Sequence, residues 1–207
     1  MTTAAHVEKE STIFGIAVNL MMAGLLSGVI LATINHFTQP IREKNEEQMR
    51  AQAMKEVLPA ALSFEAIEGF AEGSQWFRGL DADGKLMGYA LPVNTRGYEG
   101  HIAMMLGVDT SFAIVDFRLI KHRETPGLGA KASEENFIKR FRGLQVGQLE
   151  VSKSPEPGKV LAITGATITS RAIATAFEKR LQQLATLAAD DFKEIPAEIK
   201  AEGGKHE

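Results

Sequence analysis

Residues 163–170 read Ile-Thr-Gly-Ala-Thr-Ile-Thr-Ser, which places four hydroxyl side chains and one glycine directly before a helical pattern. From Ser170 onward, apolar residues recur at helical spacing and predict an amphipathic helix: Ala172, Ile173, Ala176, Phe177, Leu181 and Leu184. The first N–H groups of a helix have no acceptor within it and lie at the positive end of its dipole. A Ser/Thr cluster at this position most often caps the helix, but it can also bind phosphate. The stretch therefore predicts either a simple cap or a phosphate site.

Four of these residues, Thr164-Gly165-Ala166-Thr167, carry a family resemblance. They resemble the flavinylation motif of the FMN-binding domains in two related membrane complexes, the Rnf (Rsx) electron-transport complex and the sodium-translocating NADH:quinone reductase. The resemblance implies that FMN is joined through its phosphate to Thr167, and that a dedicated flavin transferase makes this bond from FAD. Thr164, Thr169, Ser170 and the N–H groups near Gly165 and Ala166 are then candidates to bind the remaining phosphate oxygens.

A second motif lies about 40 residues upstream, where residues 124–129 read Glu-Thr-Pro-Gly-Leu-Gly. Taken alone, this string predicts a turn. It also resembles the segment that the same family places against the flavin, which implies flavin contacts from Glu124, Thr125, Gly127 and Leu128. Leu128 is the best candidate to pack on the ring. The resemblance extends to an N-terminal hydrophobic segment and to Gly97-Tyr98-Glu99-Gly100, and a length of 207 residues favours the G subunit of Rnf over the longer C subunit of the reductase.

One position departs from the family pattern. Family members usually carry an aspartate three residues before the first Ser/Thr of the motif, where this chain has Leu161, and the nearest upstream acid is Glu156. If that aspartate helps the transferase to recognise its target, the departure predicts less efficient modification of Thr167.

Composition excludes several other classes of function. The net charge is −3 and no basic block is present, which argues against nucleic-acid binding. The chain has no cysteine, so it forms no disulfide and supplies no thiolate to an iron–sulfur cluster. Its five histidines show no metal-ligand spacing, and no nicotinamide fingerprint follows Gly127. We therefore expect no metal site and no catalytic residue, because a bound flavin would carry the redox step.

Residues 14–37 form an uncharged apolar run that predicts a single transmembrane helix after an N-terminal tail at residues 1–13. Twenty-four residues would span roughly 36 Å, enough to cross a hydrocarbon core of about 30 Å with some tilt. The flanking basic residues, Lys9 before the span and Arg42, Lys44 and Arg50 after it, favour a cytoplasmic location for the remainder. The resemblance implies the opposite, with the soluble domain on the outer face of the cytoplasmic membrane, and that is the orientation we expect.

The remaining chain predicts an α+β fold in which helices flank one antiparallel sheet. A juxtamembrane helix is expected within residues 38–60, and its helical pattern runs to about Val57, where Pro59 stops it. The FMN-binding domain is expected at 61–190 and a flexible tail at 191–207. A hairpin turn is expected at Asp81–Gly84, after Trp76-Phe77, and strands are expected at 86–92, 101–108, 113–121 and 160–163. A helix is expected at Ser133–Phe141, with Ser133 as its N-cap and Phe137 and Phe141 in the core.

Two classes of function follow from these patterns. The first is a membrane-anchored carrier of covalent FMN that relays electrons within an ion-translocating ferredoxin:NAD oxidoreductase complex, with the other Rnf subunits and a flavin transferase as partners. Its main alternative is the C subunit of the sodium-translocating NADH:quinone reductase. The second class is a membrane-tethered module, without redox function, that binds a phosphorylated ligand at the same helix N-terminus.

Overall fold

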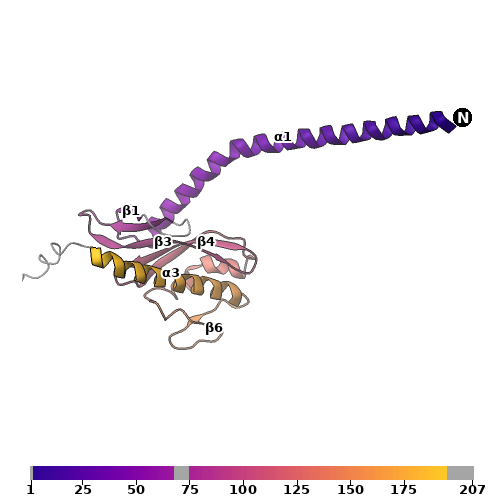
Figure 1. Ribbon diagram of the computed structural model, residues 1–207. Coiled ribbons are helices and arrows are strands. Elements are labelled where there is room, and N and C mark those ends of the chain that lie inside the picture. Colours follow the sequence, from indigo (N-terminus) through magenta and orange to yellow (C-terminus); the bar gives the residue numbers. More distant parts are fainter. Residues whose placement is uncertain (1, 68–74, 195–207) are drawn as a thin grey trace, which may run out of the picture. The chain divides into compact units, whose positions relative to one another are not determined.

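The computed structural model describes residues 2–67 and 75–194 (Figure 1). Helix α1 (Thr2–Val57) precedes five strands: β1 (Ser63–Ile67), β2 (Trp76–Leu80), β3 (Leu86–Arg96), β4 (His101–Asp109) and β5 (Ile114–Lys121). Then come the 3-10 helix η1 (Gly129–Ser133), α2 (Glu135–Ile138), β6 (Val151–Ser152), β7 (Val160–Leu161) and α3 (Thr167–Glu194). The chain forms two compact units, which divide between residues 48 and 49.

Helix α1 contains the predicted membrane span. Its stretch from Phe14 onward reaches a mean hydropathy of 2.1, and in the described part of the chain it alone is long and apolar enough to cross a membrane. The hydroxyls of Ser27, Thr33 and Thr38 each donate to the carbonyl four residues earlier, at 2.7–2.8 Å. Such internal bonding suits a hydrocarbon environment, which offers polar groups no water. The hydroxyls of Ser27 and Thr33 are thus compatible with a membrane environment.

The boundaries of α1 differ from those expected from the sequence. One continuous helix extends from Thr2 to Val57, through the expected tail at 1–13, the span at 14–37 and most of the helix at 38–60. It ends two residues before Pro59, as predicted, since proline disfavours helical backbone at the residue before it. At the other terminus, α3 extends to Glu194, and the rest of the expected flexible tail, residues 195–207, lies outside the described residues.

The sheet is an antiparallel meander in the order β1-β2-β3-β4-β5, which confirms the predicted fold class. The predicted turn after β2 is present: Asp81 Oδ1 accepts from the N–H groups of Asp83 and Lys85 at 2.9 Å, and Gly84 has a φ of 76°. Strand β3 extends beyond Pro92 to Arg96, because β4 pairs with it from Gly88 to Arg96. Strand β2 pairs with β3 only as far as Ala90, so Pro92 needs no donor on that side.

Apolar layers cover both faces of the sheet. On one face, α3 packs over a core in which Phe117, Phe141 and Phe177 meet edge to face, with ring centroids 4.9–5.5 Å apart. On the other face, Val57 and neighbouring side chains pack against Ala90 and Met105. The approach there is close, since a Cβ added at Gly107 would lie 2.2 Å from the carbonyl oxygen of Val57. Residues 49–67 and 75–194 therefore form three layers, with the sheet in the middle (Figure 1).

The prediction of one helix over Ser133–Phe141 was wrong, because the helix is much shorter. Ser133 ends η1, and its hydroxyl donates backwards to the carbonyl of Ala130 at 2.8 Å, so it does not cap the following turn. Helix α2 is a single turn, and further turns carry the chain on to Gly143, where φ is 78°. The predicted core positions of Phe137 and Phe141 are confirmed, because both side chains are buried.

A two-stranded parallel ladder, β6 with β7, was not predicted. The expected strand at 160–163 contains only Val160 and Leu161. Ala162 still donates to the carbonyl of Ser152, but the N–H of Ile163 donates to the hydroxyl of Ser170 at 3.0 Å. Ile163 thus leaves the ladder, and the chain turns into the threonine motif.

Candidate functional site

The threonine motif forms a tight turn that leads into α3. Ala166 donates its N–H to the carbonyl of Ile163 at 2.9 Å, and Gly165 has a φ of 78°, a conformation that favours glycine. A Cβ added at Gly165 would also lie 2.9 Å from Leu128 Cδ2. Glycine is therefore required here both for the backbone conformation and for the close approach of the neighbouring loop.

Helix α3 begins three residues earlier than predicted, at Thr167. The N–H of Ser170 donates to the carbonyl of Ala166 at 3.0 Å, which makes Ala166 the N-cap residue. The sequence suggested a later start because the apolar residues at helical spacing were traced from Ser170 onward. Ser170 lies within the helix, where its hydroxyl donates to the carbonyl of Ala166, four residues back.

Alanine is a poor N-cap residue, because its side chain has no oxygen to accept from the first helical N–H groups. The N–H groups of Thr167, Ile168 and Thr169 lie in the first turn, where the helix itself offers no acceptor. The positive end of a 28-residue helix lies at the same point. This arrangement suits an anionic group of the ligand.

The second motif forms the predicted turn after β5. The carbonyl of Thr125 accepts from the N–H groups of Leu128 at 3.1 Å and Ala130 at 3.2 Å, and Gly127 has a φ of 78°. The turn brings Leu128 close to Gly165 in the first motif. Two motifs that lie about 40 residues apart in the sequence thus form one site.

Glu124 joins three segments of the site. Its carboxylate is buried and accepts from the hydroxyl of Thr169 at 2.5 Å and from the N–H of Glu99 at 3.1 Å. Two glycines provide the space that the carboxylate occupies, because a Cβ at Gly97 or at Gly129 would lie 2.4 or 2.2 Å from its oxygens. Glu124 therefore holds α3, the loop after β3 and the loop after β5 together.

A cleft of about 390 Å³ opens where these segments meet. Seven residues expected from the sequence line it: Glu124, Thr125, Leu128, Gly165, Ala166, Thr167 and Thr169. Gly127 shapes the adjoining turn without lining the cleft. Thr164 is exposed and lines a separate hollow beside it. The hydroxyls of Thr169 and Ser170 are buried and bonded within the protein, whereas Thr167 is only partly buried at the cleft.

Sequence reasoning missed three residues that line the cleft, namely Tyr98, Gly129 and Ile168. Tyr98 and Ile168 are 70% and 58% exposed and, with Leu128 at 43%, form an apolar rim. The string Gly97-Tyr98-Glu99-Gly100 was the available signal, since an exposed tyrosine between glycines before a strand is unusual for a simple turn. The rim offers flat apolar surface to a ring-shaped ligand.

The hollow on the other side of the motif contains the departure from the family pattern. Leu161 is half-buried there, and Arg140 donates from Nη1 to the carbonyl of Leu161 at 2.6 Å. The nearest upstream acid, Glu156, accepts from Ser152 at 2.6 Å and pairs with Lys159 at 3.0 Å, which lowers the pKa of its carboxyl. Both partners of Glu156 thus lie in its own loop, and its side chain does not take the place of the missing aspartate.

The remaining side chains give no support to a metal site. In the described residues, no group of three His, Cys, Asp or Glu side chains is arranged to hold a metal ion. His122 does not line the cleft, although it lies two residues before Glu124. What the cleft offers is a helix N-terminus, one partly buried hydroxyl and an apolar rim. These features suit a phosphorylated aromatic molecule.

Three comparisons with known proteins bear on this site. Residues 97–182, which contain both motifs, match the family model of the FMN-binding domain. The chain is 30% identical over 183 residues to the G subunit of the proton-translocating ferredoxin:NAD(+) oxidoreductase complex of Clostridium ljungdahlii, covering 88% of this chain and 97% of that relative. It is 32% identical over 168 residues to the G subunit of an ion-translocating oxidoreductase complex of Methanosarcina acetivorans, covering 78% and 88%.

Among solved structures, the C subunit of the Na(+)-translocating NADH-quinone reductase of Parabacteroides distasonis has the same fold. The TM-score is 0.54 at 20% identity, over 67% of this chain and 89% of that chain. This likeness concerns the fold alone, whereas the two curated relatives match along most of the sequence. The chain therefore belongs to the family of G subunits of the Rnf-type ion-translocating oxidoreductase complexes.

Proposed function

We propose that this chain is a membrane-anchored flavoprotein subunit that carries FMN and relays electrons within an ion-translocating ferredoxin:NAD oxidoreductase complex. The observation that carries the proposal is the convergence of both motifs on one cleft at the N-terminus of α3. The relatives at about 30% identity are subunits of such complexes. Other subunits of the complex are therefore the expected partners.

The residues of the cleft fit FMN. The first N–H groups of α3 would hold the phosphate, since Ala166 leaves them without a side-chain acceptor. Leu128, Tyr98 and Ile168 would pack against the ring. Glu124 fixes the loops on either side through Thr169 and Glu99. When bound, the flavin supplies the electron-transfer chemistry, and the protein orients it and tunes its potential.

We further propose that the phosphate is esterified to Thr167. Of the two hydroxyls near the turn that are not buried, Thr167 lines the cleft and Thr164 lies in the neighbouring hollow. A flavin transferase would join Thr167 Oγ1 to the flavin phosphate of FAD. In that reaction the pyrophosphate bond breaks, AMP leaves and the threonine hydroxyl loses its proton. The resulting phosphodiester keeps one negative charge at the positive end of α3.

The proposed location is the cytoplasmic membrane, with the domain that follows α1 on the extracytoplasmic side. The apolar, exposed side chains of residues 14–37 support the membrane anchor. The orientation rests on the family resemblance, against a weak opposite bias in the flanking basic residues.

Intact-mass measurement tests the attachment. The full chain would be produced beside a flavin transferase, with Thr167→Ala as the test variant and Thr164→Ala as the matched control. We expect the masses of the wild-type chain and of Thr164→Ala to increase by the mass of FMN minus one water molecule. We expect Thr167→Ala to stay unmodified. Modification of Thr167→Ala would place the bond elsewhere. If the wild-type chain stays unmodified but still binds flavin, the proposal of a covalent bond is wrong. If the wild-type chain holds no flavin, the proposed carrier function is wrong.

A further inference from the structure

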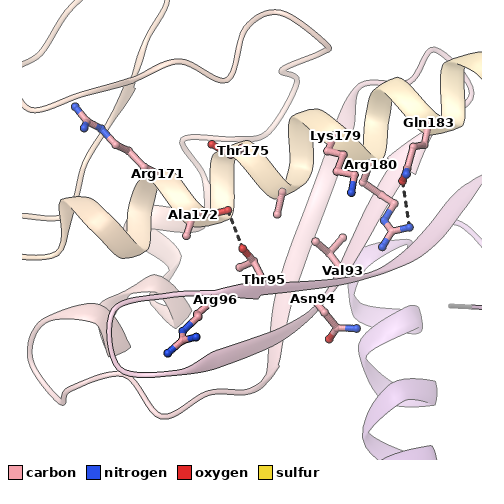
Figure 2. Close-up of a pocket in the computed structure, with 11 residues that line it drawn as sticks. Val93, Asn94, Thr95, Arg96, Arg171, Ala172, Thr175, Lys179, Arg180 and Gln183 are labelled. Carbon is pink, nitrogen blue, oxygen red and sulfur yellow. Dashed lines mark hydrogen bonds between the residues drawn. The ribbon is translucent and has the colours of Figure 1, made fainter. Parts of the chain in front are cut away.

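A second groove, of about 440 Å³, lies between β3 and α3 and shares no lining residue with the flavin cleft (Figure 2). Strand and helix are tied together at this point, because the hydroxyl of Thr95 donates to the carbonyl of Ala172 at 3.3 Å. The residues that line the groove come only from these two elements. The groove is therefore built into the fold and does not depend on a loop.

Its lining is strongly basic. Four cationic side chains line the groove, and no carboxylate does: Arg96, Arg171, Lys179 and Arg180. The whole chain has a net charge of −3, so this density of positive charge is a local feature. Arg96 and Lys179 are exposed and have no ion-pair partner among the described residues. Positive charge without compensation on a surface favours an anionic partner.

The charges are spread along the groove. Arg171 and Lys179 are eight residues apart on α3, which corresponds to roughly 12 Å along the helix axis. Figure 2 shows Lys179 and Arg180 extending from α3 toward β3, while Arg171 lies at the outer rim and is directed away from the strand. The Arg180 guanidinium lies 5.3 Å from the centre of the Trp76 ring and donates to Gln183 at 3.2 Å, so it is held in place. A single phosphate would need donors that converge on one point, whereas this spacing matches an extended anion.

The groove also contains neutral polar groups between the charges, namely Asn94, Thr175 and Gln183. Amides and hydroxyls of this kind can bond to the backbone of an extended peptide. The groove also lies close to the proposed flavin site. Arg171 follows Thr167 by four residues, so the two lie on neighbouring parts of one helix face. A protein bound in the groove would lie about one helical turn from the proposed flavin attachment.

We propose that this groove binds an acidic segment of another subunit of the complex and so places that subunit beside the flavin. This inference rests on the proposed function, since it takes its partner from the same complex. Surface charge of this kind acts mainly on the association rate and on the choice of partner. Binding should therefore weaken as salt screens the charges.

Photo-crosslinking in the assembled complex tests the proposal. The full chain would carry a photo-reactive residue in place of Thr175 in the groove. Crosslinked peptides would then be identified in the wild-type background and in Arg96→Glu/Lys179→Glu. The matched control is Lys85→Glu/Lys153→Glu, which makes the same change in net charge at exposed residues outside the groove.

We expect a crosslink to a segment rich in Asp and Glu from another subunit of the complex. Its yield should fall about tenfold in the groove variant and stay near wild type in the control. It should also fall as ionic strength approaches about 1 M, where the screening length is ~3 Å. A crosslink that is absent, that charge reversal does not change, or that joins the flavin transferase, a lipid or a non-acidic segment would overturn the proposal.

Intact mass, measured on the same samples, separates this proposal from the proposed function. A wild-type chain that carries FMN but gives no crosslink rejects the groove assignment alone. A chain without flavin rejects the carrier function, and the crosslink then still reports on the groove.

Discussion

The hydroxyl of Thr169 donates to the buried carboxylate of Glu124 at 2.5 Å, across 45 positions of sequence. This bond joins the first turn of α3 to the loop after β5 at the base of the flavin cleft. The same carboxylate accepts from the N–H of Glu99, so one side chain fixes three segments. Two predictions concern the consequences of disturbing it.

Glu124→Gln should destabilise the domain and reduce its flavin content. The carboxylate offers one oxygen to the hydroxyl of Thr169 and the other to the N–H of Glu99. The glutamine amide has a single oxygen, so one of these two donors loses its acceptor. A buried donor without a partner costs about 1–3 kcal/mol. Thermal unfolding and flavin absorbance of the purified full chain would measure both effects, with Glu65→Gln as an exposed control. An unchanged melting temperature would show that the carboxylate does not hold the loops together.

Gly129→Ala should be destabilising for a steric reason. The added Cβ would lie 2.2 Å from Glu124 Oε2, and the carboxylate could move only by giving up its bonds. We expect a loss of about 1–3 kcal/mol in the free energy of unfolding. Gly100→Ala is the matched control, because its nearest neighbour would lie 3.7 Å away. Equal unfolding curves for the two variants would contradict the packing described for Glu124.

Leu161→Asp should increase the fraction of chains that carry FMN when transferase is limiting. The family pattern has an aspartate at this position, and Leu161 lines a hollow together with two cations, Lys131 and Arg140, and one carboxylate, Glu134. A carboxylate at position 161 would lie among more positive than negative charge and remain accessible to a second protein. Intact mass after short co-expression would give the modified fraction, with Leu161→Asn as the uncharged control. A fraction equal to wild type would show that this position does not limit the transferase.

The proposed orientation predicts the labelling of an introduced thiol. The natural chain has no cysteine, so a single Lys153→Cys change at an exposed position creates one reactive site. With the domain on the outer face, a membrane-impermeant maleimide should label this variant before the cytoplasmic membrane is permeabilised. Labelling only after permeabilisation would place the domain in the cytoplasm, as the flanking basic residues suggest.

Local patterns predicted strands β3, β4 and β5 and the turn before β3, whereas β1 was not predicted and the two motifs were recognised by their resemblance to a family. The turn at Asp81–Gly84 depends on a side-chain bond from Asp81 and on a glycine with positive φ, and both are local properties of the sequence. The role of Glu124 was not predictable in this way. Its partners lie 25 and 45 positions away, and its burial depends on two glycines from different loops. The sequence placed Glu124 near the site, but only the folded chain shows that it binds other parts of the protein.

The helix boundaries failed for a related reason. Ser133 and Ser170 both have the side chain of a good N-cap residue, yet each donates its hydroxyl to a carbonyl earlier in the chain. Which of these bonds a serine makes depends on the turn before it, and the sequence does not specify that turn. Ala166, which has no capping group, occupies the cap position of α3.

If Thr167 is esterified as proposed, the position of Ala166 would link maturation to stability. A helix start without a capping oxygen frays more readily, and a missing cap typically costs about 1 kcal/mol. A phosphodiester at Thr167 would accept the free N–H groups and close that end of α3. The start of α3 would then be less stable in the unmodified chain than in the flavoprotein. Thr167 would therefore stay accessible until the flavin transferase has modified it.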